Sequence, residues 1–433
     1  MSSVKLTPIK WIQDNQEDLV KFIQDIVRIP SVSGKEEDVQ KFIFNKLNEL
    51  NLETKYVYPD IETLRKNEDF FETTSFTKYG YENRPNVAGV LKGTGNGRSI
   101  CLNGHVDVVS PEPVEHWIFD PWGGEKEGDF IYGRGAGDMK AGVASIIFAL
   151  QALKETNTKL KGDVFIETTI DEEDGGIGGC LYMRLTQPKA DAALIPEPGG
   201  YTIGVASAGV MYFRVIVTGI PAHAATAHYG VNAIVKMVPI IKALKSLNEK
   251  RQKEIRYQYA EVDPSMKGKA TTLNIGVINA GDWPSTVPAL CTLDCRIGFP
   301  PGETREMVID QIENAIQETT QKDEWLREHP PKIEWFGWKA RPHEQDPNHP
   351  FVKVLENNIK KFMELSPLYV GGSAGLDARF FVHHGIPAIS FGPYGEKIHS
   401  IDERVSISST LKITEIIIST IMDWCGVETD KKD

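Results

Sequence analysis

Residues 164–174 read VFIETTIDEED, a run suited to a buried β-strand followed at once by four carboxylates. Three other apolar runs also lead into side chains that bind metal ions. They are residues 99–103 before His105, residues 192–195 before Glu197 and residues 388–391 before the loop with His399. In open α/β sheets, ligands bind outside the carboxyl ends of the strands. The pattern therefore predicts a metal-binding rim along one edge of a sheet.

The order of strands and helices predicts two domains in this chain of 433 residues. Strands alternate with helices up to residue 207, which indicates a mainly parallel sheet covered by helices. From residue 208 the order becomes strand, helix, strand, strand, helix, strand, typical of a small α+β sandwich. We expect an α/β catalytic domain formed by residues 1–207 and 336–433, with residues 208–335 as an inserted domain.

Two segments of the first domain need separate mention. Residues 130–132 are apolar and are predicted to form one of the alternating strands. Residues 61–85 are polar, dotted with aromatic residues and long for a connection, and long loops in compact domains often cover a binding site. The sequence leaves open whether this segment covers the substrate or is a surface insertion.

Composition excludes several classes of protein. The net charge of −12 argues against non-specific binding to nucleic acid. No apolar run approaches the roughly 20 residues that a membrane helix needs, and the first residues lack the pattern of a signal peptide. The five cysteines are odd in number and scattered without CxxC spacing. We therefore expect a cytoplasmic enzyme that contacts no membrane.

The residues between the strands suit two metal ions better than a nucleotide. His105 and Asp107 are two positions apart, so they face the same side of an extended segment. The glycine-rich stretch at 133–140 lacks the spacing of a phosphate-binding loop and instead delivers Asp138 to the rim. Glu172 and Glu173 crowd together after a strand, and like charges this close destabilise one another unless a cation is present.

Two rival sites fit the sequence less well. The acidic turn at 171–174 is no EF-hand, because its twelfth position is Tyr182 rather than glutamate. Residues 371–375 match GxSxG around Ser373, the setting of a serine nucleophile. However, His399 precedes Asp402 after this serine, whereas that fold places the acid before the histidine. Serine hydrolysis is therefore disfavoured.

Taken together, these motifs resemble the superfamily of dinuclear zinc amidohydrolases that includes acetylornithine deacetylase, succinyl-diaminopimelate desuccinylase, aminoacylase and glutamate carboxypeptidase. The resemblance covers most of the chain and is nearest to the first two enzymes. It is carried by NGHVDVVS (103–110), YGRGAGDMKAG (132–142), DEEDGG (171–176), PEP (196–198), GIPAHAA (219–225), GDWPSTVPA (281–289) and FGPYGEKIHSIDERV (391–405).

The resemblance implies two divalent metal ions per chain, expected to be zinc, with cobalt or manganese as alternatives. His105 and Glu197 hold one ion, and Glu173 and His399 hold the other. Asp138 bridges the two ions. As in the family, the peptide bond between Asp138 and Met139 is expected to be cis.

The resemblance also implies the catalytic and substrate-binding residues. Glu172 is the general base, and Asp107 orients His105. The inserted domain makes the homodimer contact, from which His223 reaches the partner's active site and stabilises the oxyanion. Arg296 and Arg379 are candidates to bind a substrate carboxylate, because the guanidinium group suits bidentate pairing. A structural ion pair is the alternative for either residue.

Two departures from the family pattern concern the substrate. Ser285 stands where many members carry asparagine, and residues 371–380 read GGSAGLDARF rather than the usual glycine-rich motif. The expected function is hydrolysis of the amide bond in a small N-acylated molecule, most simply an N-acyl amino acid. The alternatives are an N-formylaminopyrimidine deformylase, a metallo-exopeptidase acting on dipeptides, and a binding protein without catalysis.

Overall fold

The computed structural model describes residues 7–264, 266–372 and 374–428. The chain divides into two compact units. The first comprises residues 1–205, 344–369 and 376–433, and the second comprises residues 206–343 and 370–375. Three of the four borders between the units fall within short strands: β8 (Ile203–Ser207), β13 (His343–Glu344) and β14 (Tyr369–Gly371).

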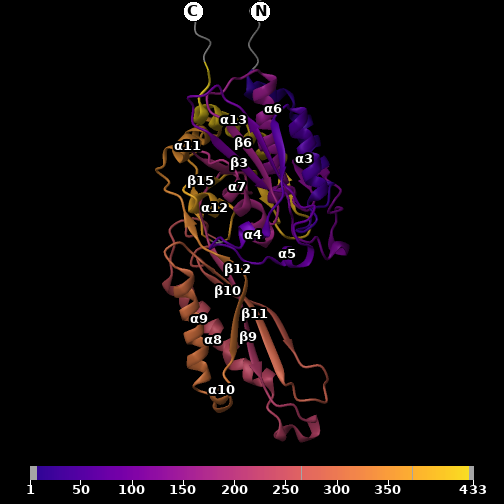
Figure 1. The fold of residues 1–433 in the computed structure, drawn as a ribbon, viewed down its shortest axis with the longest axis vertical. Helices are drawn as coiled ribbons and strands as arrows, with labels where there is room; N and C mark the ends of the chain where they lie inside the picture. Colours follow the sequence, from indigo (N-terminus) through magenta and orange to yellow (C-terminus); the bar gives the residue numbers. More distant parts are fainter. Residues whose placement is uncertain (1–6, 265, 373, 429–433) are drawn as a thin grey trace, which may run out of the picture. The chain divides into compact units, whose positions relative to one another are not determined.

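A twisted sheet forms the centre of the first unit (Figure 1). Its strands lie in the order β1 (Glu53–Val57), β2 (Asn86–Leu91), β6 (Val164–Thr169), β3 (Ile100–His105), β7 (Ala193–Ile195) and β15 (Ala388–Ser390), followed by β8. Strands β6, β3, β7 and β15 pair in parallel, whereas β1, β2 and β8 pair antiparallel at the sides. The predicted parallel sheet is confirmed for its central strands.

The strand predicted at residues 130–132 is present, but it does not belong to the central sheet. These residues form β5 (Phe130–Tyr132), which lies in a separate antiparallel sheet with β4 (Glu125–Glu127), β17 (Arg404–Ser406) and β16 (Gly395–Glu396). Strand β5 pairs with β17, about 270 residues later in the chain, as in Arg404 opposite Tyr132. A short apolar run does not reveal such a distant partner, so its alternation with helices misled the prediction.

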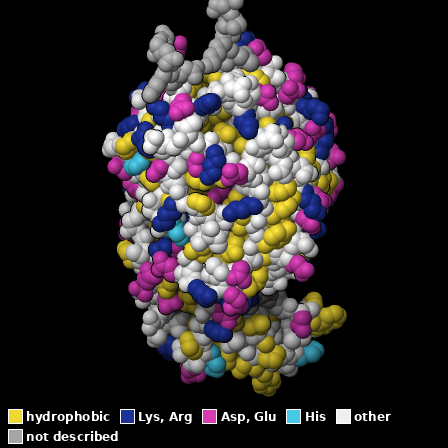
Figure 2. All heavy atoms as spheres, turned by 45° about the horizontal axis from the view of Figure 1, so that its top comes forward, with side chains coloured by type: hydrophobic (Ala, Val, Ile, Leu, Met, Phe, Trp, Pro, Cys, Tyr) yellow, Lys and Arg dark blue, Asp and Glu magenta, His cyan; other side chains and the backbone are white. Residues whose placement is uncertain are grey.

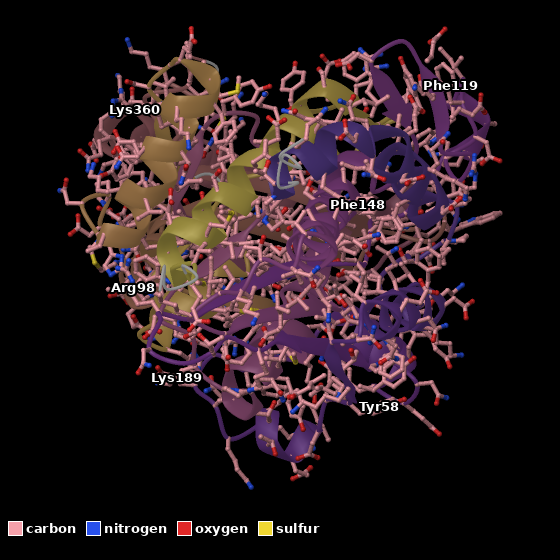
Figure 3. The ribbon with its side chains drawn as sticks, turned by 90° about the horizontal axis from the view of Figure 1, so that it is seen from above. Tyr58, Arg98, Phe119, Phe148, Lys189 and Lys360 are labelled. Carbon is pink, nitrogen blue, oxygen red and sulfur yellow. The ribbon has the colours of Figure 1, made fainter. Side chains whose placement is uncertain are left out.

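Helices cover the central sheet (Figure 1). They are α1 (Pro8–Asp14), α2 (Gln16–Val27), α3 (Glu37–Glu49), α4 (Ile61–Leu64), α5 (Thr74–Tyr79), η1 (Val114–His116), η2 (Ala136–Lys140), α6 (Ala141–Glu155), η3 (Glu172–Asp174), η4 (Ile177–Leu181), α7 (Tyr182–Thr186), α11 (Pro350–Met363), α12 (Ala378–His383) and α13 (Ile407–Cys425). The central helix α6 packs against α1, α2 and α13. Phe148 of α6 lies among these helices in Figure 3, with its ring centroid 5.4 Å from that of Phe22.

Helix α6 is part of a stretch that is long and apolar enough to resemble a membrane span. Residues Ala136–Glu155 have the length and hydropathy of a membrane span, but 89% of that stretch is buried inside the first unit. Its apolar residues therefore pack in the core of the domain. On the face seen in Figure 2, acidic and basic side chains lie next to one another, so the negative net charge is not gathered into one patch there.

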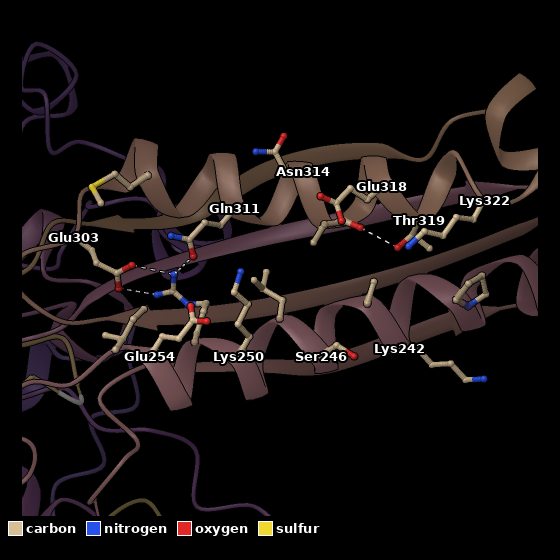
Figure 4. A pocket seen from close by; sticks show the side chains of 17 residues that line it. Lys242, Ser246, Lys250, Glu254, Glu303, Gln311, Asn314, Glu318, Thr319 and Lys322 are labelled. Atoms are coloured by element: carbon tan, nitrogen blue, oxygen red, sulfur yellow. Dashed lines mark hydrogen bonds and ion pairs between the residues drawn. The ribbon is translucent and has the colours of Figure 1, made fainter.

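The second unit is the predicted α+β sandwich. Its antiparallel sheet has the order β10 (Thr272–Ala280), β11 (Leu290–Phe299), β9 (Gly209–Thr218), β12 (Lys332–Ala340), and its helices are η5 (Ala224–Tyr229), α8 (Ala233–Glu254), α9 (Arg305–Thr320) and α10 (Glu324–Glu328). Alternate residues of β9, including Phe213, Val215 and Val217, are buried against the helices. An open groove runs between α8 and α9, where Arg251 pairs with Glu303 (Figure 4), and no predicted site residue lines it.

Candidate metal centre

The predicted ligands of the first unit meet at one edge of its sheet. His105 is the last residue of β3, Glu173 follows β6, and Glu197 follows β7. His399 lies farther along the chain after β15, in the loop between β16 and β17. These four strands are neighbours and run parallel. Their carboxyl ends therefore lie together, which is the position where open α/β sheets bind ligands.

The inner set of candidate ligands consists of His105, Asp138 and Glu197. The Nε2 atom of His105 lies 3.0 Å from Oδ1 of Asp138 and 3.7 Å from Oε1 of Glu197. One ligand atom from each residue falls within 4.8 Å of the others. The side chain of His105 is only 1% exposed, so this set is enclosed by protein.

The outer set consists of Asp138, Glu173 and His399, and it is more open. The Nε2 atom of His399 lies 2.9 Å from Oε2 of Glu173 and 3.4 Å from Oδ2 of Asp138. The His399 side chain is 47% exposed. Asp138 presents Oδ1 to the inner set and Oδ2 to the outer set, so a single carboxylate is shared between two ligand clusters.

The loop that carries Asp138 has an unusual backbone. The peptide bond between Asp138 and Met139 is cis, which confirms the expectation from the resemblance. Gly135 adopts φ of 78°, a left-handed conformation that glycine tolerates without steric cost. Gly137 is packed so closely that an added Cβ would lie 2.5 Å from Ile398. Gly135 is therefore required by the shape of this loop, whereas at Gly137 an added Cβ would meet only the end of the flexible Ile398 side chain.

Asp107 links the inner histidine to the acidic loop. Its main-chain carbonyl lies 2.9 Å from Nδ1 of His105, and its carboxylate is farther from that atom, at 3.6 Å. The carboxylate instead accepts the main-chain N–H groups of Glu172 at 3.0 Å and Glu173 at 3.2 Å, and the hydroxyl of Ser33 at 2.8 Å. The backbone of Asp107 thus orients His105, while its side chain fixes the two glutamates.

The electrostatics of the cluster favour a bound cation. Burial raises the pKa of both Glu173 and Glu197 to about 7, and neighbouring Asp138 adds to the rise. Burial alone would lower the pKa of His105, but the charge of Glu197 and the hydrogen bond to Asp138 raise it well above its usual value. Oε1 of Glu197 is buried without a hydrogen-bond partner among the described residues. Carboxylate oxygens and imidazole nitrogens arranged in this way fit divalent metal ions.

Glu172 lies beside these ligands without belonging to either set. Its side chain is 7% exposed, and its Oε1 atom has no hydrogen-bond partner among the described residues. Burial raises the pKa of this carboxyl well above its usual value. A carboxylate with a raised pKa next to a metal site has the properties of a general base.

The segment at residues 61–85 braces the acidic loop, which the sequence analysis did not anticipate. The hydroxyl of Ser75 donates to Asp171 at 2.6 Å, and its main-chain N–H donates to Asp174 at 2.6 Å. The guanidinium group of Arg84 pairs with both Asp171 and Glu36. No local pattern marks Ser75 or Arg84 as partners of residues almost 100 positions away, so the sequence carried no signal for this brace.

The substrate-binding predictions have different structural settings. Arg379 is 2% exposed and donates to the main-chain carbonyls of Leu376 at 2.9 Å and Gly175 at 2.6 Å, so it supports the acidic loop. Arg296 on β11 and His223 before η5 belong to the second unit, and their roles stay predictions. Ser373, the centre of the rejected serine motif, lies outside the described residues.

Comparison with known proteins agrees with this arrangement. Residues 101–423 match the model of peptidase family M20/M25/M40. The chain is 29% identical to N-formyl-4-amino-5-aminomethyl-2-methylpyrimidine deformylase of Bacillus subtilis, with 96% of this chain and 97% of that protein covered. It is 24% identical to succinyl-diaminopimelate desuccinylase of Pelagibacter ubique, with coverage of 94% and 98%.

A solved structure shares the fold. The tripeptidase from Staphylococcus aureus matches with a TM-score of 0.72 and 22% identity, over 95% of this chain and 99% of that one. At this identity the match concerns the fold alone.

Proposed function

This chain belongs to peptidase family M20/M25/M40, and from that premise we propose that it hydrolyses the amide bond of a small N-acylated compound with two metal ions. The observation that carries the proposal is the shared carboxylate of Asp138, which faces His105 on one side and His399 on the other. The charges of His105 and Glu173 act on Glu172, and its Oε1 atom has no hydrogen-bond partner among the described residues, so we assign it as the base.

The ligand sets specify where the metals bind. His105, Asp138 and Glu197 would hold one ion, and Asp138, Glu173 and His399 the other. We propose zinc, with cobalt and manganese as alternatives, because mixed imidazole and carboxylate sites accept several divalent ions. Ions bound at these two sets would lower the pKa of a shared water and polarise the substrate carbonyl.

Glu172 transfers the proton in this reaction. Its carboxylate removes a proton from the attacking water and delivers it to the nitrogen of the leaving amine. Asp107 accepts the main-chain N–H of Glu172, so it holds the base at a fixed position relative to His105. Burial raises the pKa of this carboxyl, which makes it a stronger base for removing the proton from the water.

His223 is proposed to stabilise the oxyanion, and its hydrogen bonding suits that role. Its Nδ1 atom accepts the main-chain N–H of Ala225 at 3.1 Å. In a neutral imidazole one nitrogen accepts and the other donates, so Nε2 carries the proton. The side chain is exposed.

The second unit supplies the surface for a homodimer. Among the described residues, strand β10 pairs on one side only, and it exposes Val277 and Ile278, which are 47% and 53% exposed. Val235 on α8 and Trp283 after β10 are 61% and 67% exposed. An unpaired strand edge with apolar side chains is a template for pairing with another copy. We therefore propose that the dimer contact lies on this surface. Size-exclusion chromatography with light scattering measures the mass of the protein in solution.

Two classes of substrate have specific support. N-acyl amino acids fit the likeness to desuccinylases, with Arg296 as the cation for the substrate carboxylate. A formylated aminopyrimidine is the second candidate, because the relative with 29% identity is a deformylase and because Arg379 is occupied by main-chain carbonyls. A cytoplasmic location is proposed as well, since all five cysteines are unpaired and buried.

The test is amine release from a panel of N-acetyl, N-succinyl and N-formyl compounds, including an N-formyl aminopyrimidine, together with dipeptides. The protein is reconstituted with zinc, and Glu172→Ala is the control. Turnover of one class that is lost in the control supports the proposal and identifies the acyl group. Turnover that survives in Glu172→Ala contradicts the role of the base, and a protein that binds no metal contradicts the dinuclear site.

A further inference from the structure

A buried ion pair connects the two loops that carry Asp138 and His399. The side chains of Arg134 and Glu403 are 3% and 1% exposed, and Nη1 of Arg134 lies 2.5 Å from Oε2 of Glu403. Glu403 is four residues after His399, and Arg134 is four residues before Asp138. Neither residue is a candidate metal ligand, and the mechanism proposed above does not use them.

Glu403 holds the backbone at the shared ligand. Its Oε1 atom accepts the main-chain N–H of Gly137 at 3.0 Å and the main-chain N–H of Asp138 at 3.1 Å. Its own carbonyl accepts the N–H of Gly133 at 2.9 Å. One glutamate thus contacts both ends of the loop that presents Asp138.

Arg134 makes the corresponding contact with the other loop. Its Nη2 atom donates to the carbonyl of Ser400, the residue after His399, at 3.2 Å. The guanidinium group also lies over the ring of Trp117, 5.2 Å from the centroid, which leaves it little freedom to move. The two loops touch again where Ile398 packs on Gly137.

We propose that the Arg134–Glu403 pair is the positioning device of the outer ligand set, which fixes Asp138 and His399 relative to each other before a metal binds. This inference rests on the dinuclear site proposed above. The backbone of His399 needs such support, because the φ angle of His399 is 60°, which is unfavourable for a residue with a side chain. The inner set depends less on the pair, since His105 and Glu197 follow directly from neighbouring strands.

The chain offers a matched control for this pair. Arg184 and Glu167 form another buried ion pair, with side chains 1% and 4% exposed. Neither contacts a candidate ligand in the part of the chain that the structure describes. Glu167→Gln therefore removes a buried charge of the same kind without disturbing the loops of the metal centre.

The experiment measures zinc binding in the full-length protein by competition with a chromophoric chelator, with metal content checked by mass spectrometry. In Glu403→Gln, we expect the weaker of the two zinc affinities to fall about 10- to 100-fold, the usual effect of removing a residue that orients metal ligands. The tighter affinity is expected to change less, and Glu167→Gln to change neither. The cobalt-substituted protein gives a second readout, because its visible spectrum reports the geometry of each ion.

A second variant keeps the test decisive if Glu403→Gln does not fold. Arg134→Lys retains the charge but lacks the forked guanidinium group that reaches Ser400. It is therefore expected to lower the affinity for the same zinc ion by a smaller factor. Equal losses in Glu403→Gln and Glu167→Gln, or unchanged affinities in both Arg134→Lys and Glu403→Gln, overturn the inference. If the unmodified protein binds fewer than two zinc ions, the dinuclear proposal itself fails and this inference fails with it.

Discussion

The inner and outer ligand sets share Asp138 but are held in place by different means. His105 of the inner set ends a buried strand, is 1% exposed and bonds to the carbonyl of Asp107. His399 of the outer set lies in a loop, is 47% exposed and has a left-handed backbone. A sheet positions a ligand through its backbone ladder, whereas a loop requires added contacts such as the Arg134–Glu403 pair. The difference predicts unequal metal affinities.

The largest effect is expected from Asp138→Asn, because this carboxylate serves both sets. We expect weaker binding of both metals and a loss of kcat/KM of roughly 1,000-fold, equivalent to about 4 kcal/mol of transition-state stabilisation. Metal analysis and substrate kinetics measure the two effects. Loss of only one metal would show that the carboxylate is not shared, and the comparison of the two sets would need a different basis.

Replacing each histidine in turn separates the sets. His399→Ala is expected to lose the outer metal and keep the inner one, with kcat reduced roughly 100-fold. His105→Ala removes a buried ligand and leaves a cavity, so we expect loss of the inner metal and a lower melting temperature. Metal content per chain and thermal unfolding distinguish the two variants. If His399→Ala lost the inner metal, or His105→Ala lost the outer one, the assignment of the inner set as the tighter site would be contradicted.

Metal binding should strengthen as the pH rises. Hydrogen bonds to Asp138 and Glu173 raise the pKa of His399 to about 10 when no metal is bound. A ligating imidazole must be neutral, so below pH 10 the metal displaces a proton from His399. Below pH 7 it also competes with the proton on Glu173, whose pKa burial raises to about 7. The outer affinity therefore falls about tenfold per unit between pH 9 and 7, and more steeply below.

Calorimetry in two buffers with different ionisation enthalpies checks this expectation, because it counts the protons released with each metal. In His399→Ala, the pH dependence of the remaining metal reports the inner set alone. An outer affinity that does not change between pH 9 and 7 would mean that His399 is neutral before the metal binds.

The smallest effect is expected from Ser33→Ala. The hydroxyl of Ser33 donates to Asp107, but two main-chain N–H groups continue to support that carboxylate. Loss of one such hydrogen bond costs about 1 kcal/mol, so kcat/KM should fall less than about tenfold. Steady-state kinetics with retained metal content provide the measurement. If kcat/KM, measured in both variants, fell as far in Ser33→Ala as in Glu403→Gln, the inner set would be no more robust than the outer one.

Much of this architecture was readable in the sequence because its signals are local. Apolar runs followed by His105, Glu173 and Glu197 predicted both the central strands and the ligands at their ends. The glycines around Asp138 predicted a tight loop, and the resemblance predicted its cis peptide bond. Such features depend on a few neighbouring residues and on the periodicity of strands.

Only the tertiary structure decided which distant residues support those ligands. It placed β5 in a separate sheet, directed Arg379 to the carbonyl of Gly175, and joined Glu403 to the backbone of Asp138 across 265 positions. Each of these contacts forms because folding brings charged or polar groups together in a buried place, where an unpaired group is costly. The sequence by itself thus determined the candidate ligands, and the packing of distant segments determined which contacts hold each of them in place.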